Sequence, residues 1–270
     1  MENHDSIKKT VKNKYSEIAA SAKGKGCCGP ITDCCGTNSN IEFTMIGDDY
    51  KSVDGYVPEA DLGLGCGLPT EFAGIKPGDV VVDLGSGAGN DVFIARNLVG
   101  ESGKVIGVDM TEAMIEKANQ NKSKLGYDNV EFRLGDIENL PVDDSSIDVV
   151  ISNCVLNLVP DKRKAFSEIY RILKPGAHFC VSDVVIEGEM PEEFRRSAEL
   201  YAGCVTGSLQ LDEYIELIRQ TGFGNVEIKK TRRIDLPEEL LEKYLSEQAR
   251  EDYKNSVKGI YSITVVASKK

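Results

Sequence analysis

The residues with the greatest potential for chemistry in this chain of 270 residues are its eight cysteines. Four of them stand alone in the sequence: Cys66, Cys154, Cys180 and Cys204. The other four form two vicinal pairs near the amino terminus: Cys27-Cys28 and Cys34-Cys35. A chain of this length folds without disulfides, so in a reducing compartment its thiols are expected to be ligands, catalysts or small core residues. Thiolates are the ligands that soft, thiophilic ions prefer.

Three of the single cysteines are predicted to lie in loops. Cys66 and Cys204 each have a glycine neighbour, and Cys154 lies just past the carboxyl end of a predicted strand. A lone cysteine usually behaves as a small buried hydrophobe, and Cys180, which alternates with apolar residues inside a predicted strand, fits that description. The loop positions set the other three apart as candidates for chemistry.

The elements that must position these thiols begin near residue 79, where short apolar runs start to alternate with helical periodicity. The apolar runs predict strands at residues 80–82, 105–108, 130–134, 147–152 and 178–185. The helical pattern predicts helices at residues 92–98, 111–124 and 162–173. Five strands separated by helices or crossover segments predict an α/β fold with a doubly wound, mostly parallel sheet.

The segments on either side of this alternation have their own patterns. The spacing of Ile7, Val11, Tyr15 and Ile18 predicts a short amphipathic helix before the cysteine pairs. After the fifth strand we predict a helix at 212–222, a strand at 226–229, a helix at 237–253 and a last strand at 261–267. We therefore expect a cysteine-rich segment 1–40, a cofactor-binding domain 41–187, and a smaller α+β region 188–270 that completes the sheet and binds substrate.

The charge balance narrows the class of partner. The chain has 32 Lys and Arg against 44 Asp and Glu, a formal net charge of −12. Nucleic-acid and anionic-membrane binding both require an excess of basic residues, so neither partner is expected. No run of 18 apolar residues and no secretory signal is visible, so the protein is expected to be soluble and cytoplasmic.

A glycine-rich segment between the first strand and its helix predicts a cofactor loop. It runs Asp83-Leu84-Gly85-Ser86-Gly87-Ala88-Gly89-Asn90-Asp91. Glycines allow the backbone to turn sharply and to approach a ligand at the edge where open α/β sheets bind. Asn90 stands where a dinucleotide fingerprint has its third glycine, and the acid before the glycines suits a cationic ligand better than a pyrophosphate.

Two further carboxylates follow strands at the same edge. Asp109 lies twenty residues after Gly89, where a carboxylate can hold both ribose hydroxyls. Asp136 ends the third strand, where it can accept a hydrogen bond from an adenine amino group while Ile137 packs on the ring. A nicotinamide-binding enzyme is the alternative for this half of the chain, and Asn90 counts against it.

Taken together, residues 60–186 resemble the class I S-adenosylmethionine-dependent methyltransferases through the motif Asp83-x-Gly85-x-Gly87-x-Gly89 followed by Asp109 and Gly135-Asp136. The resemblance implies S-adenosylmethionine as cofactor. It also implies a set of cofactor-binding residues: Asp83, Gly85, Gly87, Gly89, Asp91, Asp109, Met110, Asp136, Ile137 and Asn153. For Asp91, capping of the loop is an equally good interpretation.

In such a fold Cys66, Cys154 and Cys204 would all border the cofactor mouth. Zinc normally takes a fourth ligand and paired cysteines, which these are not. Trivalent arsenic is satisfied by three thiolates and keeps a lone pair that can attack a sulfonium methyl group. No proton has to leave the arsenic, so no general base is needed, and the chain has only two histidines.

A second resemblance is more specific. The run Ser152-Asn153-Cys154-Val155-Leu156-Asn157-Leu158-Val159-Pro160-Asp161-Lys162, with Gly65-Cys66-Gly67-Leu68 and the context of Cys204, looks like the signature of the arsenite methyltransferases. It implies that Cys154 and Cys204 hold arsenic, that Cys66 is a third thiol and that Cys34 or Cys35 acts in thiol exchange. Cys27 and Cys28 remain as delivery or resolving thiols.

The family also implies co-substrates and partners. We expect arsenite or its thiol conjugates as substrate, a thiol reductant such as glutathione or thioredoxin, and a monomeric enzyme that serves arsenic detoxification. Two other functions stay open: a methyltransferase for a quinone-like or sterol-like acceptor in which the cysteines are incidental, and a non-catalytic metalloid-binding protein. For the vicinal pairs, a metal-catching tail or a small zinc site with His4 is the alternative.

Overall fold

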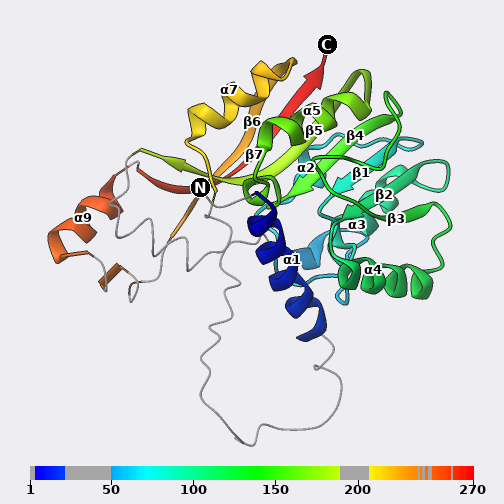
Figure 1. Cartoon of the computed structure of the whole chain (residues 1–270), viewed down its shortest axis with the longest axis horizontal. Coiled ribbons are helices and arrows are strands. Elements are labelled where there is room, and N and C mark those ends of the chain that lie inside the picture. The colour runs from blue at the N-terminus through cyan, green and yellow to red at the C-terminus, as the bar shows by residue number, and fades with distance from the viewer. Residues whose placement is uncertain are drawn as a thin grey trace, which may run out of the picture.

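The computed structural model describes residues 4–21, 50–188, 207–235, 238, 241–242, 245–256 and 258–270. These residues form a seven-stranded sheet in the order β3-β2-β1-β4-β5-β7-β6 (Figure 1). The strands are β1 (Val80–Leu84), β2 (Lys104–Asp109), β3 (Val130–Leu134), β4 (Ile147–Asn153), β5 (Leu173–Glu187), β6 (Phe223–Ile234) and β7 (Gly259–Lys269). Strands β1 to β5 pair in parallel, and β7 pairs antiparallel with both β5 and β6.

The helices are α1 (His4–Ser21), α2 (Pro69–Phe72), α3 (Asn90–Val99), α4 (Glu112–Leu125), α5 (Lys162–Ile172), α7 (Leu211–Gln220) and α9 (Glu247–Asn255), with short 3-10 turns η2 (Tyr50–Ser52) and η3 (Leu156–Leu158). Both faces of the sheet are covered by helices, and α1 packs on α4. One apolar core lies between the sheet and helices α5 and α7, and a second lies between the opposite face and helices α2 and α3. Buried strands of Val and Ile between two helix layers are typical of parallel sheets.

The prediction of a mostly parallel, doubly wound sheet is confirmed, as are the five parallel strands and the helices between them. Thr111 stands at the N-cap of α4 as expected, although its side chain makes no capping hydrogen bond. The amphipathic pattern before the cysteine pairs is also confirmed, because residues 4–21 form α1. Among the described residues, no helix is both long and apolar enough to cross a membrane.

Two predictions near the carboxyl terminus are corrected. Strand β6 extends over residues 223–234, well beyond the predicted 226–229, because pairing with β7 holds even its polar positions in the sheet. The predicted helix 237–253 is not a single element: described residues 238, 241 and 242 are helical, residues 245 and 246 are not, and α9 begins at Glu247. Ser246 caps α9 by accepting a hydrogen bond from the Ala249 N–H, and a Ser N-cap starts a new helix rather than continuing one.

The parallel register places the carboxyl ends of β1, β2 and β4 side by side at one edge of the sheet. Asp83 of β1 lies beside Gly107 of β2 and Ile151 of β4, so the loops after these strands meet at one edge. Strand β5 continues past the end of β4, since Asn153 pairs with Ser182 and β5 runs on to Glu187. That overhang forms a wall beside the loop that follows β4.

Candidate functional site

The glycine loop joins β1 to α3 through three left-handed residues. The φ angles of Gly85, Gly87 and Gly89 are +67°, +52° and +100°, a region that other residues enter at a cost. A side chain at Gly85 would also collide with Val155 of the loop after β4. At Gly87, by contrast, no described atom lies within 4 Å of where a Cβ would stand, so this backbone faces open space. The loop is therefore shaped for a ligand that approaches Gly87.

Asp109 fixes that loop from the end of β2. Its two carboxylate oxygens accept hydrogen bonds from the backbone N–H groups of Gly87 (3.0 Å) and Thr111 (2.8 Å). Burial raises the pKa of the Asp109 carboxyl, and these two hydrogen bonds oppose the rise. The carboxylate is thus held rigidly at the point where the sequence predicts a ribose contact.

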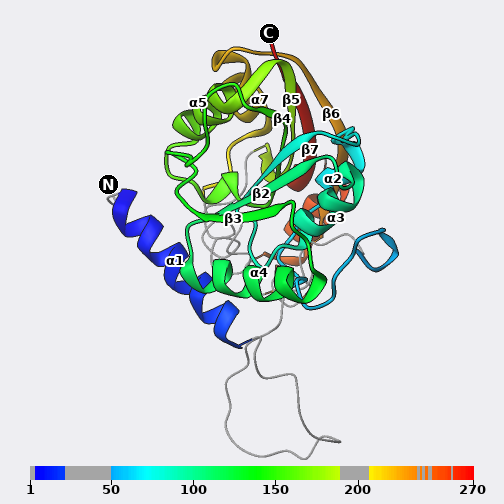
Figure 2. The same ribbon diagram turned by 90° about the vertical axis from the view of Figure 1, so that its right-hand side faces the viewer.

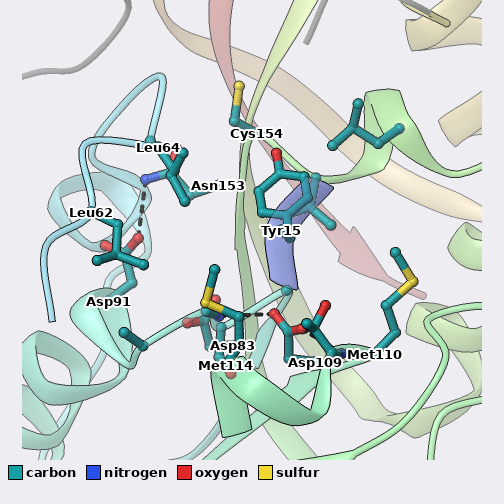
Figure 3. A pocket seen from close by; sticks show the side chains of 18 of the residues that line it. Tyr15, Leu62, Leu64, Asp83, Asp91, Asp109, Met110, Met114, Asn153 and Cys154 are labelled. Carbon is teal, nitrogen blue, oxygen red and sulfur yellow. Dashed lines mark hydrogen bonds between the residues drawn. The ribbon is translucent and has the colours of Figure 1, made fainter. Parts of the chain in front are cut away.

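A cavity of about 1100 Å³, its open mouth included, extends along this edge of the sheet (Figure 3). It is lined by every cofactor residue predicted from sequence except Gly89, together with Cys154. Residues 135–137 line the end that follows β3, where Asp136 and the largely buried Ile137 stand as expected. Met110 and Met114 add apolar surface that suits a flat ring.

The polar groups of this cavity fit a cationic ligand. Burial raises the pKa of Asp83 well above its usual value, and the nearby carboxylates of Asp91 and Asp109 raise it further. The ionisation of Asp83, which these two carboxylates oppose, would be favoured by a positive charge placed beside it. The buried Ser86 Oγ and Asn90 Oδ1 lack a hydrogen-bond partner among the described residues, and both residues line the cavity.

Asp91 lies at the end of the cavity nearest the cysteines. Its carboxylate accepts hydrogen bonds from the Tyr50 hydroxyl (3.1 and 3.2 Å) and from Asn153 Nδ2 (3.0 Å). Burial raises the Asp91 pKa to about 6, and these two donors oppose the rise. Its side chain therefore joins η2 and the end of β4 to the glycine loop, and its cofactor-binding role stays a prediction.

Asn153 also holds the loop that carries Cys66. Its Oδ1 accepts from the backbone N–H groups of Cys66 (2.9 Å) and Gly67 (3.2 Å), and its Nδ2 donates to the Gly67 carbonyl (2.8 Å). Because Asn153 directly precedes Cys154, one side chain fastens the two cysteine loops together. Asn153 lines the cavity as predicted, but its hydrogen bonds hold the Cys66 loop as well as Asp91.

The glycines beside Cys66 are explained by the same contacts. A Cβ at Gly65 would stand 2.8 Å from Asn153 Nδ2, and one at Gly67 would stand 2.6 Å from Ser182 Oγ. Both distances are shorter than a Cβ tolerates, so only glycine allows this approach. The Gly65-Cys66-Gly67 sequence is therefore required by close packing against β4 and β5.

Cys154 stands in a strained backbone conformation at the end of β4. Its φ is +61°, and its N–H donates to the Ser182 carbonyl (2.8 Å). Left-handed conformations of non-glycine residues cost free energy and occur preferentially at functional sites. Cys66 and Cys154 are both buried. Burial and the neighbouring Asp183 raise the pKa of the Tyr214 hydroxyl on α7, and both Cys66 and Cys154 lie near enough to add to that rise. The two thiols thus share one neighbourhood.

A buried polar group that the sequence reasoning missed completes this neighbourhood. Asp183 of β5 is fully buried and accepts a hydrogen bond from the Tyr214 hydroxyl (3.1 Å). Burial raises the Asp183 pKa to about 7, and the charge of Lys162 opposes the rise. Its only sequence signal was an acidic residue inside an apolar strand, which periodicity alone does not interpret.

The remaining cysteines divide into two groups. Cys180 is fully buried in the core on the α2 and α3 face, as predicted. The others lie outside the described residues: Cys27, Cys28, Cys34, Cys35 and Cys204. Within the described part of the chain, no cluster of three or more His, Cys, Asp and Glu side chains is arranged to hold a metal ion.

Comparison with known proteins agrees with this geometry. A family model described as a methyltransferase domain matches residues 75–222. An arsenite methyltransferase of Halobacterium salinarum is 43% identical over 232 residues, which are 83% of this chain and 59% of that protein. The mouse arsenite methyltransferase is 34% identical over 81% of this chain and 58% of its own length. The chain thus spans less than two thirds of both relatives.

Among solved structures, an arsenic(III) S-adenosylmethionine methyltransferase from Chlamydomonas reinhardtii superimposes with a TM-score of 0.60 at 38% identity, covering 72% of this chain and 64% of that one. The fold and the glycine loop together support S-adenosylmethionine as the cofactor. With its sheet order, its carboxylates at the strand ends and its matched domain, the chain belongs to the methyltransferase domain family and has the class I S-adenosylmethionine methyltransferase fold.

Proposed function

We propose that this protein transfers methyl groups from S-adenosylmethionine to trivalent arsenic held by cysteine thiolates. The observation that carries the proposal is the hydrogen bond from the Cys66 N–H to Asn153 Oδ1. Because Asn153 precedes Cys154, this bond holds the loops of two buried thiols, Cys66 and Cys154, side by side next to the cavity that fits the methyl donor. The arsenite methyltransferases among its relatives support the same reading.

The orientation of the cofactor follows from the carboxylates. Asp136 and Ile137 would receive the adenine, Asp109 the ribose hydroxyls, and the acidic group of Asp83 and Asp91 the cationic methionine end. Since Asn153 hydrogen-bonds to Asp91 and precedes Cys154, the sulfonium end of the cavity is also the cysteine end. This polarity directs the methyl group toward the thiols.

We propose Cys204 as the third arsenic ligand. The described chain resumes at Gly207, three residues after Cys204, and a Cβ at Gly207 would stand 2.6 Å from the Asn157 carbonyl. Gly207 therefore packs against the loop that carries Cys154, and this contact, together with the sequence context of Cys204, supports the proposal.

The chemistry balances without a general base. Each thiol that binds arsenite forms an S–As bond and releases one water, its proton leaving with the arsenic-bound hydroxyl. Bound S-adenosylmethionine would supply the methyl group: the arsenic lone pair would form the As–C bond as the sulfonium C–S bond breaks, leaving a neutral thioether. The arsenic would be formally oxidised from the trivalent to the pentavalent state, so two thiols, which become a disulfide, must supply the two electrons that return it to the trivalent state. We assign thiol exchange to Cys34 or Cys35 and reduction to glutathione or thioredoxin.

The organisation of the whole protein is part of the proposal. Residues 1–40 would supply exchange thiols, residues 41–187 the cofactor domain, and residues 188–270 the remaining substrate-binding thiol. A cytoplasmic monomer fits the reduced thiols that the chemistry requires.

One experiment tests the proposal. The reduced protein is incubated with arsenite, methyl-labelled S-adenosylmethionine and glutathione, and arsenic species are separated and counted. We expect label in methylated arsenic. Bound arsenite without label would instead indicate a sequestering protein, and absence of both binding and transfer would favour an organic methyl acceptor.

Cysteine variants localise the reaction within the same assay. Cys154→Ser and Cys204→Ser should abolish transfer while cofactor binding persists, because each removes one arsenic ligand and leaves the cavity carboxylates. Cys180→Ser serves as the matched control, since its thiol lies in the core. Equal loss of turnover in all three variants would refute this division of the cysteines.

A further inference from the structure

Helix α1 forms a wall of the cofactor cavity, although it lies far from the other lining residues in sequence. Lys8, Val11 and Tyr15 line the cavity, and their spacing of three and four residues places them on one face of the helix. Figure 2 shows α1 running beside α4, and Figure 3 shows Tyr15 projecting into the cavity. The helix therefore meets the site through one continuous face.

Lys8 fastens this face to the adenine end of the cavity. Its ammonium group lies 2.6 Å from Asp136 Oδ2 and 2.8 Å from Glu138 Oε2. Only a quarter of the Lys8 side chain is exposed, and the side chains of Glu138 and Asp136 are 7% and 42% exposed. The Lys8–Glu138 pair is therefore the shielded one, and it is screened less by salt than a pair at the surface.

Asp136 keeps room for a ligand despite this contact. Its Oδ1 accepts the Glu138 backbone N–H (2.9 Å), and its Oδ2 binds Lys8. A carboxylate can accept about four hydrogen bonds, so an adenine amino group can still donate to it. Lys8 and the adenine would thus share one carboxylate rather than exclude each other.

From this geometry we propose that α1 is the outer wall of the adenosine subsite and that Lys8 is a positioning residue, which clamps the helix to Asp136 and Glu138 and slows cofactor release. Val11 and Tyr15 would then cover the bound adenosine. The inference rests on the cofactor site of the proposed function and assigns to the amino-terminal helix a role in holding the methyl donor.

The same helix provides a matched control. Lys12, one turn after Lys8, pairs with Glu112 of α4 at 2.8 Å, and this pair stands outside the cavity with side chains 40% and 63% exposed. Lys8→Ala and Lys12→Ala each remove one ion pair that docks α1. Only the Lys8 variant removes a contact with a cavity carboxylate.

The test measures cofactor binding by the full-length protein. Affinities for S-adenosylmethionine and S-adenosylhomocysteine are obtained by calorimetry, and dissociation rates by rapid filtration of labelled cofactor. We expect Lys8→Ala to weaken binding roughly tenfold, mainly through faster dissociation, as expected for loss of a partly buried charged contact. Lys8→Arg should restore slow dissociation, and Lys12→Ala should stay within about twofold of the wild type.

The outcomes separate this inference from the proposed function. Wild-type dissociation in Lys8→Ala, with the fold verified by circular dichroism, would overturn the role of Lys8 alone. Equal dissociation rates in Lys8→Ala and Lys12→Ala would show that both ion pairs only dock α1 on the protein, and would also overturn the specific role of Lys8. Failure of the wild type to bind cofactor would overturn both the role of Lys8 and the proposed function. The expected Lys8 effect without arsenic methylation would support the role of α1 in cofactor binding and overturn the proposed transfer to arsenic.

Discussion

The side-chain oxygen of Asn153 accepts the backbone N–H of Cys66 at 2.9 Å, joining two residues that are 87 positions apart. The bond is part of a group in which Asn153 also contacts Gly67 and Asp91. The Asn153 amide is thus a hydrogen-bond partner both of the loop that carries Cys66 and of the Asp91 carboxylate in the cavity. Under the proposed function, Asn153 would therefore link the Cys66 loop to the cofactor cavity that it also lines.

Replacing Asn153 should disturb arsenite binding more than protein stability. Asn153→Ala releases the Cys66 loop, and we expect arsenite affinity, measured with the purified thiol-reduced protein, to fall at least about tenfold. Asn129→Ala is the matched control, because the Asn129 amide also ties loops together, at Gly100 and Gly103, away from the cavity. Equal arsenite affinities for the two variants would show that the Asn153 contacts are structural only.

A methyl group at Gly67 should have a similar effect by a different route. The Cβ of Gly67→Ala would stand 2.6 Å from Ser182 Oγ and 2.8 Å from Ser182 Cβ, so the loop must shift. We expect a loss of about 1–3 kcal/mol in the free energy of unfolding, together with weaker arsenite binding. Gly74→Ala, at φ +59° with no described atom near its Cβ, should cost only backbone strain and leave arsenite binding intact. Unchanged arsenite affinity in Gly67→Ala would contradict the close packing.

The buried Asp183 predicts a specific pH dependence of stability. Its pKa rises from about 4 in the unfolded chain to about 7 in the folded protein. The folded state therefore retains a proton that the unfolded state releases, so this residue's contribution to stability falls as pH rises from 4 to 7. Above pH 7 the penalty is complete.

Chemical denaturation of Asp183→Asn at pH 5 and pH 8 measures this contribution. The stability of the variant relative to the wild type should grow with pH, by up to roughly 1.4 kcal/mol per pH unit. Asp148→Asn is the control. Partial burial raises the Asp148 pKa, but the contacts with Lys174 and the Val80 N–H lower it more, so the net shift is downward. The Asp148 carboxylate therefore stays ionised between pH 5 and pH 8. Parallel curves for Asp183→Asn and wild type would rule out a raised Asp183 pKa.

Cys180 should be chemically silent. Burial raises its pKa to about 12, and the thiolate is the reactive form, so alkylation of the native protein by iodoacetamide should spare it. Cys180→Ala should cost about 1 kcal/mol of stability through a small cavity and retain methyl transfer. Mass spectrometry of peptides from the alkylated native protein provides the check, and rapid labelling of Cys180 would contradict its assignment to the core.

Much of the fold could be predicted because its signals are local. Apolar runs of Val and Ile mark buried strands, and the glycine loop with Asp109 marks the cofactor edge without any knowledge of distant contacts. The lengths of β5 and β6 could not be predicted, since polar residues such as Lys230 remain in a strand only because β7 pairs beside them. Long-range pairing leaves no periodic pattern in either strand.

The candidate site shows the same division. Glycines next to Cys66 were visible as a motif, but the reason for them lies in Asn153 and Ser182, which are far away in sequence. The spacing of Val11 and Tyr15 predicted a helix and gave no indication of its docking surface. Side chains that join two loops across the sheet edge are recognised only once the topology is known.

The acidic group at the glycine loop has a consequence for the energetics of cofactor binding. Because burial and nearby carboxylates raise the pKa of both Asp83 and Asp91, protonation of these groups would remove the negative charge that a cationic ligand meets. Methyl donor and hydrogen ion are therefore competitors for the same negative charge. The proposed cofactor site would therefore lose affinity for its cation as the pH falls and regain it as these carboxyls ionise.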